Sequence, residues 1–395
     1  MPKVNPNILR WAREKARLTL EEAAEKLGLP DIKNMSASDR LVALEKGKDE
    51  PTRSLLVKMT KQYRRPLLTF YMSTPPRQGE RGQDFRTLTD NYAIEKDVIL
   101  DTLIRDIYAR QSMLCVVLKD EEDAKPLPFI DSTKLSDGIS VVLKSIQQTI
   151  PFDLDVFYNK PSPENAFAYL RSTVEKTGVF VLLISNLGSH HTSIEVEMFR
   201  GFALADNIAP FVIINDQDSK TAWSFTLLHE LAHLWLGQTG ISGLSSNKTI
   251  EKFCNDVASE FLLPTEKLRL ININSAMESE EIKTSISEFA RSHNLSGSMV
   301  AYKLFRTGLI SESLWHQLSH SYRELWYHAM LKQRTKARES EGGGPSYYMV
   351  RRHRIGVHLI TLVQRMMAAG SLTTSKAAKV LGIKPQNIQT LINSH

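Results

Sequence analysis

The sequence contains little cysteine and lacks any long apolar run. Only Cys115 and Cys254 occur in 395 residues, which is too few for a disulfide framework and is compatible with a reducing cytosol. No stretch of about 18 uninterrupted apolar residues is present, which argues against a membrane-spanning helix. Residues 1–15 lack the apolar core of a signal peptide, which argues against export. These absences predict a cytoplasmic protein with no membrane partner.

Beyond residue 73 the sequence also lacks net charge, because it holds 35 Lys/Arg and 35 Asp/Glu. The whole excess of +6 lies in residues 1–73, which contain 15 Lys/Arg and 9 Asp/Glu. A basic segment is the electrostatic footprint expected of a nucleic-acid-binding module. A small solvated basic domain would carry the same charge, so the alternative stays open.

The chain is long enough for two or three domains, and its apolar pattern predicts an α+β fold. Short helices are expected over residues 1–73, where Thr19 and Glu22 have the spacing of a capping box and Gly28 has the place of a C-cap. Strands are expected at 179–185 and 211–216, between helices. Further segments are predicted by composition: a boundary at 73–82, a helical connecting region at 90–150, a Gly-rich linker at 337–348 and a helical C-terminal region at 349–395.

The stretch TLLHELAHLWLG, residues 226–237, is apolar on nearly every side yet contains His229, Glu230 and His233. A helix that is apolar all round is typical of a buried position. The two histidines are four residues apart, so both rings project from one face within roughly 6 Å of each other. Burying these polar groups unpaired would cost several kcal/mol, and a divalent metal bound by both rings removes that cost. Core histidines bonded to backbone carbonyls are the alternative, but they leave Glu230 unexplained.

In the H-E-x-x-H pattern Glu230 is not a ligand; it holds the water and accepts its proton. A catalytic zinc needs a third protein ligand, and Glu251 on the next expected helix (IEKFCNDVASEFLLP, 250–264) borders that helix's buried stripe. Glu260 lies nine residues later, about 180° around the helix, so both acids cannot face the metal. Cys254 is the competing ligand, although a small buried cysteine is the commoner outcome. Two histidines and a glutamate favour hydrolysis and zinc, with Mn²⁺ as the alternative, and a structural zinc site would be richer in cysteine.

These motifs, in this order, resemble the ImmA/IrrE family of zinc metallopeptidases. The likeness rests on GVFVLLIS (178–185), on RGFALADNIAPFVIINDQDSKTAWSFTLLHELAHLWL (200–236) and on the glutamate helix, and it covers roughly residues 160–265. It implies a zincin-like metallopeptidase domain over 151–330, with His229, His233 and Glu251 as metal ligands and Glu230 as the catalytic residue. Family members cleave a partner repressor of the Xre class, in mobile elements or stress responses. The resemblance therefore implies a zinc-dependent endopeptidase with an Xre-family repressor as its substrate.

The N-terminal residues are similar to long family members that carry an Xre/Cro-type helix-turn-helix, on LEKGKDEPTRSLLVKMTKQYRRPLLTFYMSTPP (44–76) and DFR (84–86). The segment between Gly28 and Gly47 is several residues too long for a tight turn, so either the turn is enlarged or the recognition helix is shifted. We expect residues 34–44 to be the recognition region. Predicted contacts to double-stranded DNA comprise base-reaching residues and phosphate contacts: Ser36, Ser38 and Arg40 for the first, and Arg53, Lys61, Arg64 and Arg65 for the second. A degenerate helix-turn-helix kept for protein docking is the alternative.

FVIIND (211–216) is expected to offer an edge strand to an extended substrate, so that Ile213→Pro would abolish cleavage and leave the metal bound. His190 and His191 could enter a metal cleft, but a solvated loop is favoured. The rival interpretation of the whole chain is a DNA-binding regulator or antitoxin-like protein whose metal domain acts as a sensor or docking module. Glu230 favours the enzyme, because a sensor has no need of it.

Overall fold

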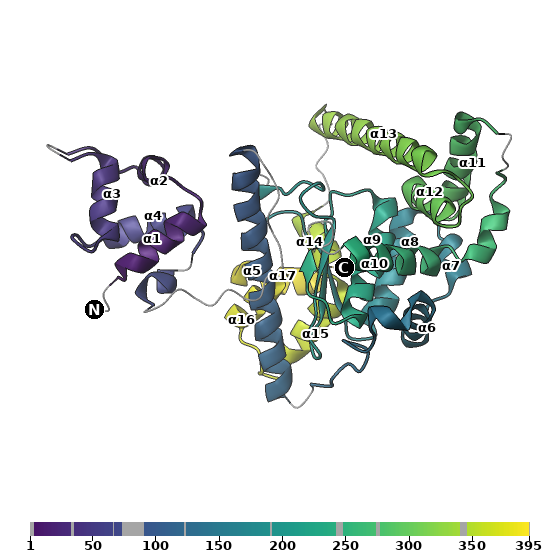
Figure 1. The fold of residues 1–395 in the computed structure, drawn as a ribbon. Helices are drawn as coiled ribbons and strands as arrows, with labels where there is room; N and C mark the ends of the chain where they lie inside the picture. The colour runs from purple at the N-terminus through teal and green to yellow at the C-terminus, as the bar shows by residue number, and fades with distance from the viewer. Residues whose placement is uncertain are drawn as a thin grey trace. The chain divides into compact units, whose positions relative to one another are not determined.

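The structure, a computed structural model, describes residues 4–32, 35–65, 67–72, 91–121, 124–189, 192–241, 248–273, 277–339 and 346–394. It divides into two compact units. Of the described residues, the first unit holds 4–72, 91–106 and 186–194, and the second holds 107–185 and 195–394 (Figure 1). The predicted boundary at 73–82 lies outside the described residues. No helix among the described residues is long and apolar enough to cross a membrane.

The first unit contains four short helices and a closing 3-10 turn: α1 (Pro6–Lys15), α2 (Leu20–Leu27), α3 (Ala37–Glu45), α4 (Arg53–Gln62) and η1 (Leu67–Tyr71). The capping box of Thr19 and Glu22 is confirmed, and Gly28 ends α2 in the left-handed conformation, with φ 63°. The turn after α2 is enlarged, since α3 begins only at Ala37, and Ile32 and Met35 form an isolated β-bridge within it. The enlarged turn is therefore the alternative that the structure supports.

A buried ion pair joins α1 to α3 in this unit. Arg13 donates from Nε and Nη2 to the two carboxylate oxygens of Glu45, at 2.7 and 3.0 Å, and both side chains are nearly inaccessible to water. Removing one partner of such a pair leaves an uncompensated buried charge, which costs about 3–5 kcal/mol.

We therefore expect Glu45→Ala to destabilise the first unit by about 3–5 kcal/mol. Hydrogen exchange at the amides of α1 and α3 measures this opening without interference from the second unit. The double variant Arg13→Met/Glu45→Leu removes both charges and should recover most of the protection. Unchanged exchange in Glu45→Ala would show that the pair contributes nothing to this unit.

The long helix α5 (Asn91–Asp120) begins in the first unit and ends in the second. In the second unit its Gln111 side chain donates to the carbonyl oxygens of Leu204 and Ala209, at 3.0 and 2.9 Å. These bonds fix the loop between two strands of the sheet to the helix.

The second unit is mostly helical and has a four-stranded sheet, consistent with the predicted α+β class: β1 (Phe180–Leu183), β2 (Gly201–Leu204), β3 (Phe211–Ile214) and β4 (Gly240–Ile241). The strand order is β1-β3-β2-β4, with β1 and β3 parallel and the other pairs antiparallel. The two predicted strands correspond to β1 and β3. However, β3 pairs along its whole length with β1 on one side and β2 on the other.

The prediction of an edge strand at 211–216 is therefore wrong. All four residues of β3 are buried and both of its edges are paired, so it cannot accept an added substrate strand. An Ile213→Pro substitution would remove a ladder hydrogen bond from a central strand and damage the fold. It would test stability rather than substrate binding.

Helices cover the sheet and carry most of the core. The helices α6 (Ile139–Thr149), α7 (Leu154–Tyr158) and α8 (Pro163–Glu175) precede the first strand, α9 (Lys220–Trp235) lies between β3 and β4 in the chain, and α10 (Lys248–Leu262) follows β4. The helix α9 packs on β2 and β3 and lies between α8 and α10 (Figure 1). After the 3-10 segment η4 (Thr265–Leu270) come α11 (Ser279–Ser292), α12 (Gly297–Arg306) and α13 (Glu312–Glu339). Because α13 continues through Glu339, the predicted linker at 337–348 begins too early.

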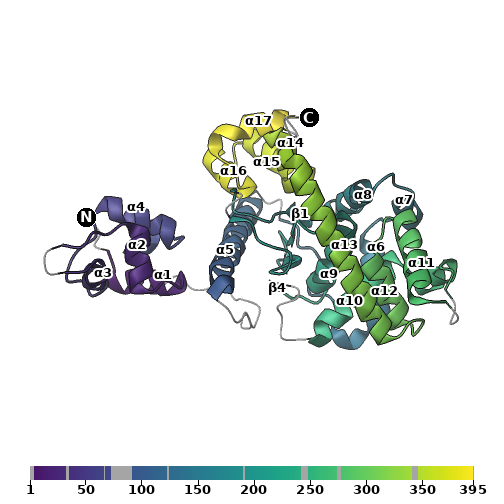
Figure 2. The same cartoon turned by 90° about the horizontal axis from the view of Figure 1, so that it is seen from above.

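Four helices end the chain: α14 (Tyr347–Ile355), α15 (Val357–Ala368), α16 (Thr374–Leu381) and α17 (Ile388–Asn393), with the 3-10 segment η5 (Pro385–Asn387) before α17. Figure 2 shows them as a cluster at one edge of the second unit. The buried Arg171 of α8 holds this cluster, because it pairs with Glu175 at 2.9 Å and donates to the carbonyl oxygens of His353 and Arg354. The C-terminal cluster is therefore part of the second unit, not an independent tail.

Candidate metal centre

The helix α9 is buried around nearly its whole circumference, as its apolar sequence predicts. It begins at Lys220 after Ser219, and a left-handed glycine, Gly237, follows its last turn at φ 63°. Its buried side chains pack on β2 and β3 and on the flanking helices α8 and α10. His229, Glu230 and His233 lie within this buried surface, at 5%, 0% and 8% exposure.

The structure brings His229, His233 and Glu251 together. The two Nε2 atoms are 3.1 Å apart, and they lie 3.3 and 3.4 Å from the two carboxylate oxygens of Glu251. Two ligands that each bind zinc at 2.0–2.1 Å with tetrahedral geometry are separated by about 3.3 Å. The three donor atoms, all within 4.8 Å of one another, therefore fit a divalent metal ion.

Burial and charge at this cluster also favour a cation. Burial alone would raise the pKa of the Glu251 carboxyl, but hydrogen bonds and charge interactions with His229 and His233 hold that pKa well below its usual range. Burial would lower the pKa of the His233 imidazole, whereas its hydrogen bonds with Cys254 and Glu251 raise it above its ordinary value. Both shifts arise from the close approach of the two imidazoles to the ionised Glu251 carboxylate, which places negative charge where a cation would bind.

Glu260 and Cys254, the other two candidates for the third metal ligand, do not join His229 and His233 as Glu251 does. Glu260 turns away from the cluster and binds Lys303 and Thr265, so the prediction that both acids cannot face the metal is confirmed. The Cys254 thiol is fully buried and is a hydrogen-bond neighbour of His233, yet it is not one of the three donors that converge within 4.8 Å.

Glu230 points from α9 toward the first residue of β2. A Cβ atom placed on Gly201 would lie 2.8 Å from Glu230 Oε1 and 2.6 Å from Thr226 Cγ2. The absent side chain of Gly201 therefore makes the space in which the Glu230 carboxylate lies. Gly201 could not be recognised from sequence as part of the site, because a glycine at the start of a strand has several structural explanations.

A Gly201→Ala substitution should displace the Glu230 carboxylate and lower turnover about 100-fold, since a misplacement of about 1 Å at a reacting group can cost that much. Metal content should stay at the parental level, because the three atoms nearest to the added Cβ belong to Thr226 and Glu230 and not to a metal-binding residue. Activity assays with metal analysis measure both effects. The double variant Gly201→Ala/Thr226→Ser removes the competing Thr226 methyl group, so full recovery there would assign the loss to Thr226 instead of Glu230.

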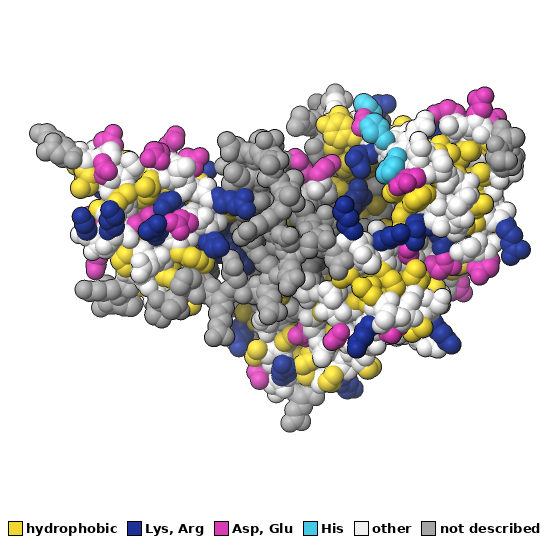
Figure 3. All heavy atoms as spheres, viewed as in Figure 1, with side chains coloured by type: hydrophobic (Ala, Val, Ile, Leu, Met, Phe, Trp, Pro, Cys, Tyr) yellow, Lys and Arg dark blue, Asp and Glu magenta, His cyan; other side chains and the backbone are white. Residues whose placement is uncertain are grey.

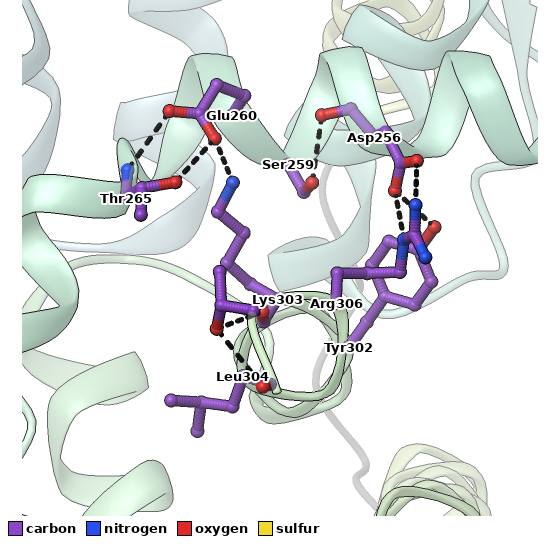
Figure 4. A network of polar contacts seen from close by, with 9 residues as sticks. Asp256, Ser259, Glu260, Thr265, Tyr302, Lys303, Leu304 and Arg306 are labelled. Carbon is purple, nitrogen blue, oxygen red and sulfur yellow. Dashed lines mark hydrogen bonds and ion pairs between the residues drawn. The ribbon is translucent and has the colours of Figure 1, made fainter. Parts of the chain in front are cut away.

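The glutamate helix α10 is held against α12 by two groups of polar contacts (Figure 4). Asp256 accepts hydrogen bonds from Arg306 Nε and Nη2, at 2.7 and 2.6 Å, and from the Tyr302 hydroxyl at 2.7 Å. One turn later, Glu260 accepts from the buried Lys303. These contacts fix the rotation of α10, and with it the direction in which Glu251 faces. The paired spacing of acids on one helix and bases on the other is the sequence signal that could have identified them.

The predicted DNA contacts of α3 are largely engaged within the first unit. Ser36 caps α3, since its hydroxyl accepts from the Asp39 amide and donates to the Asp39 carboxylate at 2.6 Å. Ser38 lies 3.1 Å from that hydroxyl, and Arg40 donates to the Pro30 carbonyl oxygen at 2.7 Å. Asn34, the first residue of the predicted recognition region, lies outside the described residues.

The predicted phosphate contacts fall into two groups. Arg53 and Lys61 on α4 are exposed. Arg64 and Arg65 are only half-exposed, and the Arg65 guanidinium stacks 4.6 Å above the Trp11 ring.

His190 and His191 lie outside the described residues, so the structure does not place them near the metal cluster.

The geometry and one family comparison agree on the class of protein. Two histidines one helical turn apart, a glutamate between them and a second glutamate from the next helix form the arrangement of a metal-dependent hydrolase. Residues 176–305 match the family model of the IrrE N-terminal-like domain, Peptidase_M78. The match supports the ImmA/IrrE family and a metallopeptidase-type function for this segment, which spans β1 to α12. No curated protein and no solved structure matched the chain.

Proposed function

We propose that the chain is a zinc-dependent endopeptidase that cleaves a transcriptional repressor of the Xre class. The observation that carries the proposal is the convergence of His229, His233 and Glu251 within 4.8 Å, directly beside the buried Glu230. The match to a peptidase family supports hydrolysis of a peptide bond. Two imidazoles and one carboxylate favour zinc over Mn²⁺, which prefers oxygen ligands. We place the reaction in the cytoplasm, where the free thiols of Cys115 and Cys254 would stay reduced.

His229, His233 and Glu251 would hold the zinc ion, which when bound polarises the scissile carbonyl and acidifies a water molecule. Glu230 accepts a proton from the water as its oxygen attacks the carbonyl carbon. Glu230 then gives that proton to the leaving amine as the C–N bond breaks, so that a carboxylic acid and an amine are formed. Its complete burial keeps bulk water away from the proton during this transfer.

The first unit supports a second, coupled role in DNA binding, on the observation that Arg53 and Lys61 are exposed on α4. In Figure 3 Lys and Arg side chains spread across the face of this unit that is turned to the viewer, with Asp and Glu side chains among them. An exposed lysine or arginine of this kind provides a salt-sensitive, sequence-blind contact to phosphate. If the protein does not hydrolyse peptide bonds, the remaining proposal is that it is a DNA-binding regulator whose metal domain acts as a sensor.

The test of the peptidase is incubation of purified protein with Xre-type repressors encoded near it. Three samples are compared: the protein as isolated, the protein after removal of metal by a chelator, and the stripped protein after addition of Zn²⁺ or Mn²⁺. We expect limited cleavage by the first sample, none by the second, and recovery with zinc. Equal inertness of all samples, together with specific DNA retention, would overturn the peptidase in favour of the regulator.

A further inference from the structure

The C-terminal cluster α14–α17 has an unusual charge. Residues 346–394 contain seven Lys/Arg and no Asp or Glu. The neutral total beyond residue 73 therefore conceals a second basic segment, which acids elsewhere in the chain offset. The absence of acids over this length is characteristic of a surface that meets a polyanion.

The chain also contains an internal match between its two basic segments. LTLEEAAEKLG, residues 18–28, and LTTSKAAKVLG, residues 372–382, share Leu, Thr, a pair of Ala, Leu and Gly at the same spacing. Each forms an eight-residue helix, α2 or α16, whose threonine N-cap accepts from the backbone amide three residues later. Gly28 and Gly382 end the two helices in the left-handed conformation, at φ 63° and 65°. The two helices are therefore built alike.

The segments differ in the two features on which DNA recognition depends. After α2 the next helix begins only at Ala37, whereas after α16 the turn is Gly382–Lys384 and helical structure resumes at Pro385. A turn of three to four residues containing glycine is that of a helix-turn-helix. In addition, the three acids of α2, Glu21, Glu22 and Glu25, correspond to Ser375, Lys376 and Lys379 in α16.

The second helix of this pair presents a polar face. Ile388 and Leu391 are buried in the cluster with α14 and α15. The opposite side exposes Gln386, Gln389, Thr390 and Asn393, at the i, i+3, i+4, i+7 spacing of one helix face. Glutamine and asparagine are the side chains that make paired hydrogen bonds to adenine in the major groove. The exposed Lys376 and Lys384 flank this face at the first helix and at the turn.

We propose that α15–α17 form a second helix-turn-helix that binds double-stranded DNA, with residues 385–393 as the recognition helix. Gln386, Gln389 and Asn393 read base edges in the major groove. Lys376 and Lys384 contact phosphates on its two sides. The contacts of Arg171 with the α14 carbonyls fix this module to the second unit, so DNA binding is rigidly connected to the metal domain. The proposal goes beyond the peptidase function and does not depend on it.

The test uses the full chain and a pool of random-sequence duplexes, with repeated selection of bound DNA followed by sequencing at about 150 mM salt. The parent should enrich a short sequence motif. Gln386→Ala/Gln389→Ala should lose the motif while keeping sequence-blind binding. Lys376→Gln/Lys384→Gln should weaken binding to a selected duplex at least tenfold. The slope of log K against the logarithm of the salt concentration should become less steep by about two, because each lost phosphate contact lowers it by about 0.9.

The matched control is Arg53→Gln/Lys61→Gln in the first unit, which should leave the selected motif unchanged. Zinc content and far-UV circular dichroism should be parental in every variant, because all these side chains are exposed. A motif that survives the glutamine variants but is lost with the control would assign recognition to the first unit and overturn the proposal. The proposal would also be overturned if no sequence were enriched. The same holds if the face formed by Gln386, Gln389, Thr390 and Asn393 bound a protein and no DNA duplex.

Discussion

Glu230→Gln should lower the rate of peptide hydrolysis by about 10²–10⁴-fold, the usual contribution of a positioned acid–base group. Glutamine has nearly the same volume as glutamate and fits the space beside Gly201, but it cannot accept the proton of the attacking water. Because Glu230 does not belong to the converging donor group, the variant should bind zinc in the parental amount. Single-turnover cleavage of a repressor substrate, with metal analysis of the same sample, measures both properties.

The matched control is Glu266→Gln, an equivalent change at an exposed glutamate of η4 outside the metal cluster. It should cleave at the parental rate. Parental turnover in Glu230→Gln would show that another group accepts the proton. Loss of zinc together with activity would show that Glu230 holds the metal site together instead of performing the chemistry.

The metal cluster could be predicted from sequence because its information is local. His229 and His233 are separated by one helical turn, and the apolar residues around them require burial, so the cost of desolvation favours a bound metal. Glu251 was identified by the same reasoning on a single helix, from its position relative to the buried stripe. The structure adds the 3.3 and 3.4 Å distances across two helices, which the spacing on either helix could not give.

The features that the sequence analysis missed depend on contacts between distant segments. The strand β2, GFAL, lacks the β-branched residues that indicated β1 and β3, and β4 has only two residues, so the order β1-β3-β2-β4 was not foreseeable. This order reversed the prediction for β3, which is central instead of lying at an edge. The space at Gly201 and the pairing of Asp256 with Arg306 likewise exist only after β2, α10 and α12 have packed.

Net charge over a long range points to only one of the two basic segments, although the short stretch VRRHRIG (350–356) is itself visibly basic and was interpreted as a solvated helix start. A total taken over residues 74–395 is zero, because acids elsewhere balance the seven bases of residues 346–394. For the N-terminal segment the sequence left two alternatives, an enlarged turn or a shifted recognition helix, and the structure shows α3 beginning at Ala37. The turn after Gly382 is recognised as short only by comparison with the N-terminal segment. Helical structure resumes at Pro385 after α16, whereas α3 begins only at Ala37 after α2.

The identity of the third ligand has the second large expected effect. Glu251→Ala should reduce zinc affinity by more than the roughly 10–100-fold that loss of a supporting contact costs, because it removes a direct ligand. Cys254→Ala should leave zinc content at the parental level, since the thiol is outside the donor group that converges within 4.8 Å. Equilibrium dialysis against a zinc buffer, followed by metal analysis, compares the two variants directly.

Thermal unfolding provides an independent measure of the same difference. A metal that binds only the folded state stabilises it by about 4 kcal/mol when its free concentration is a thousandfold above Kd. A chelator should therefore lower the melting temperature of the parent and of Cys254→Ala, and should have a much smaller effect on Glu251→Ala, which binds the metal more weakly. If Cys254→Ala loses zinc and Glu251→Ala retains it, the site is a two-histidine, one-cysteine centre. That result would remove the ligand argument for a peptidase, because the carboxylate of Glu251 would then be a partner of the imidazoles without a role at the metal.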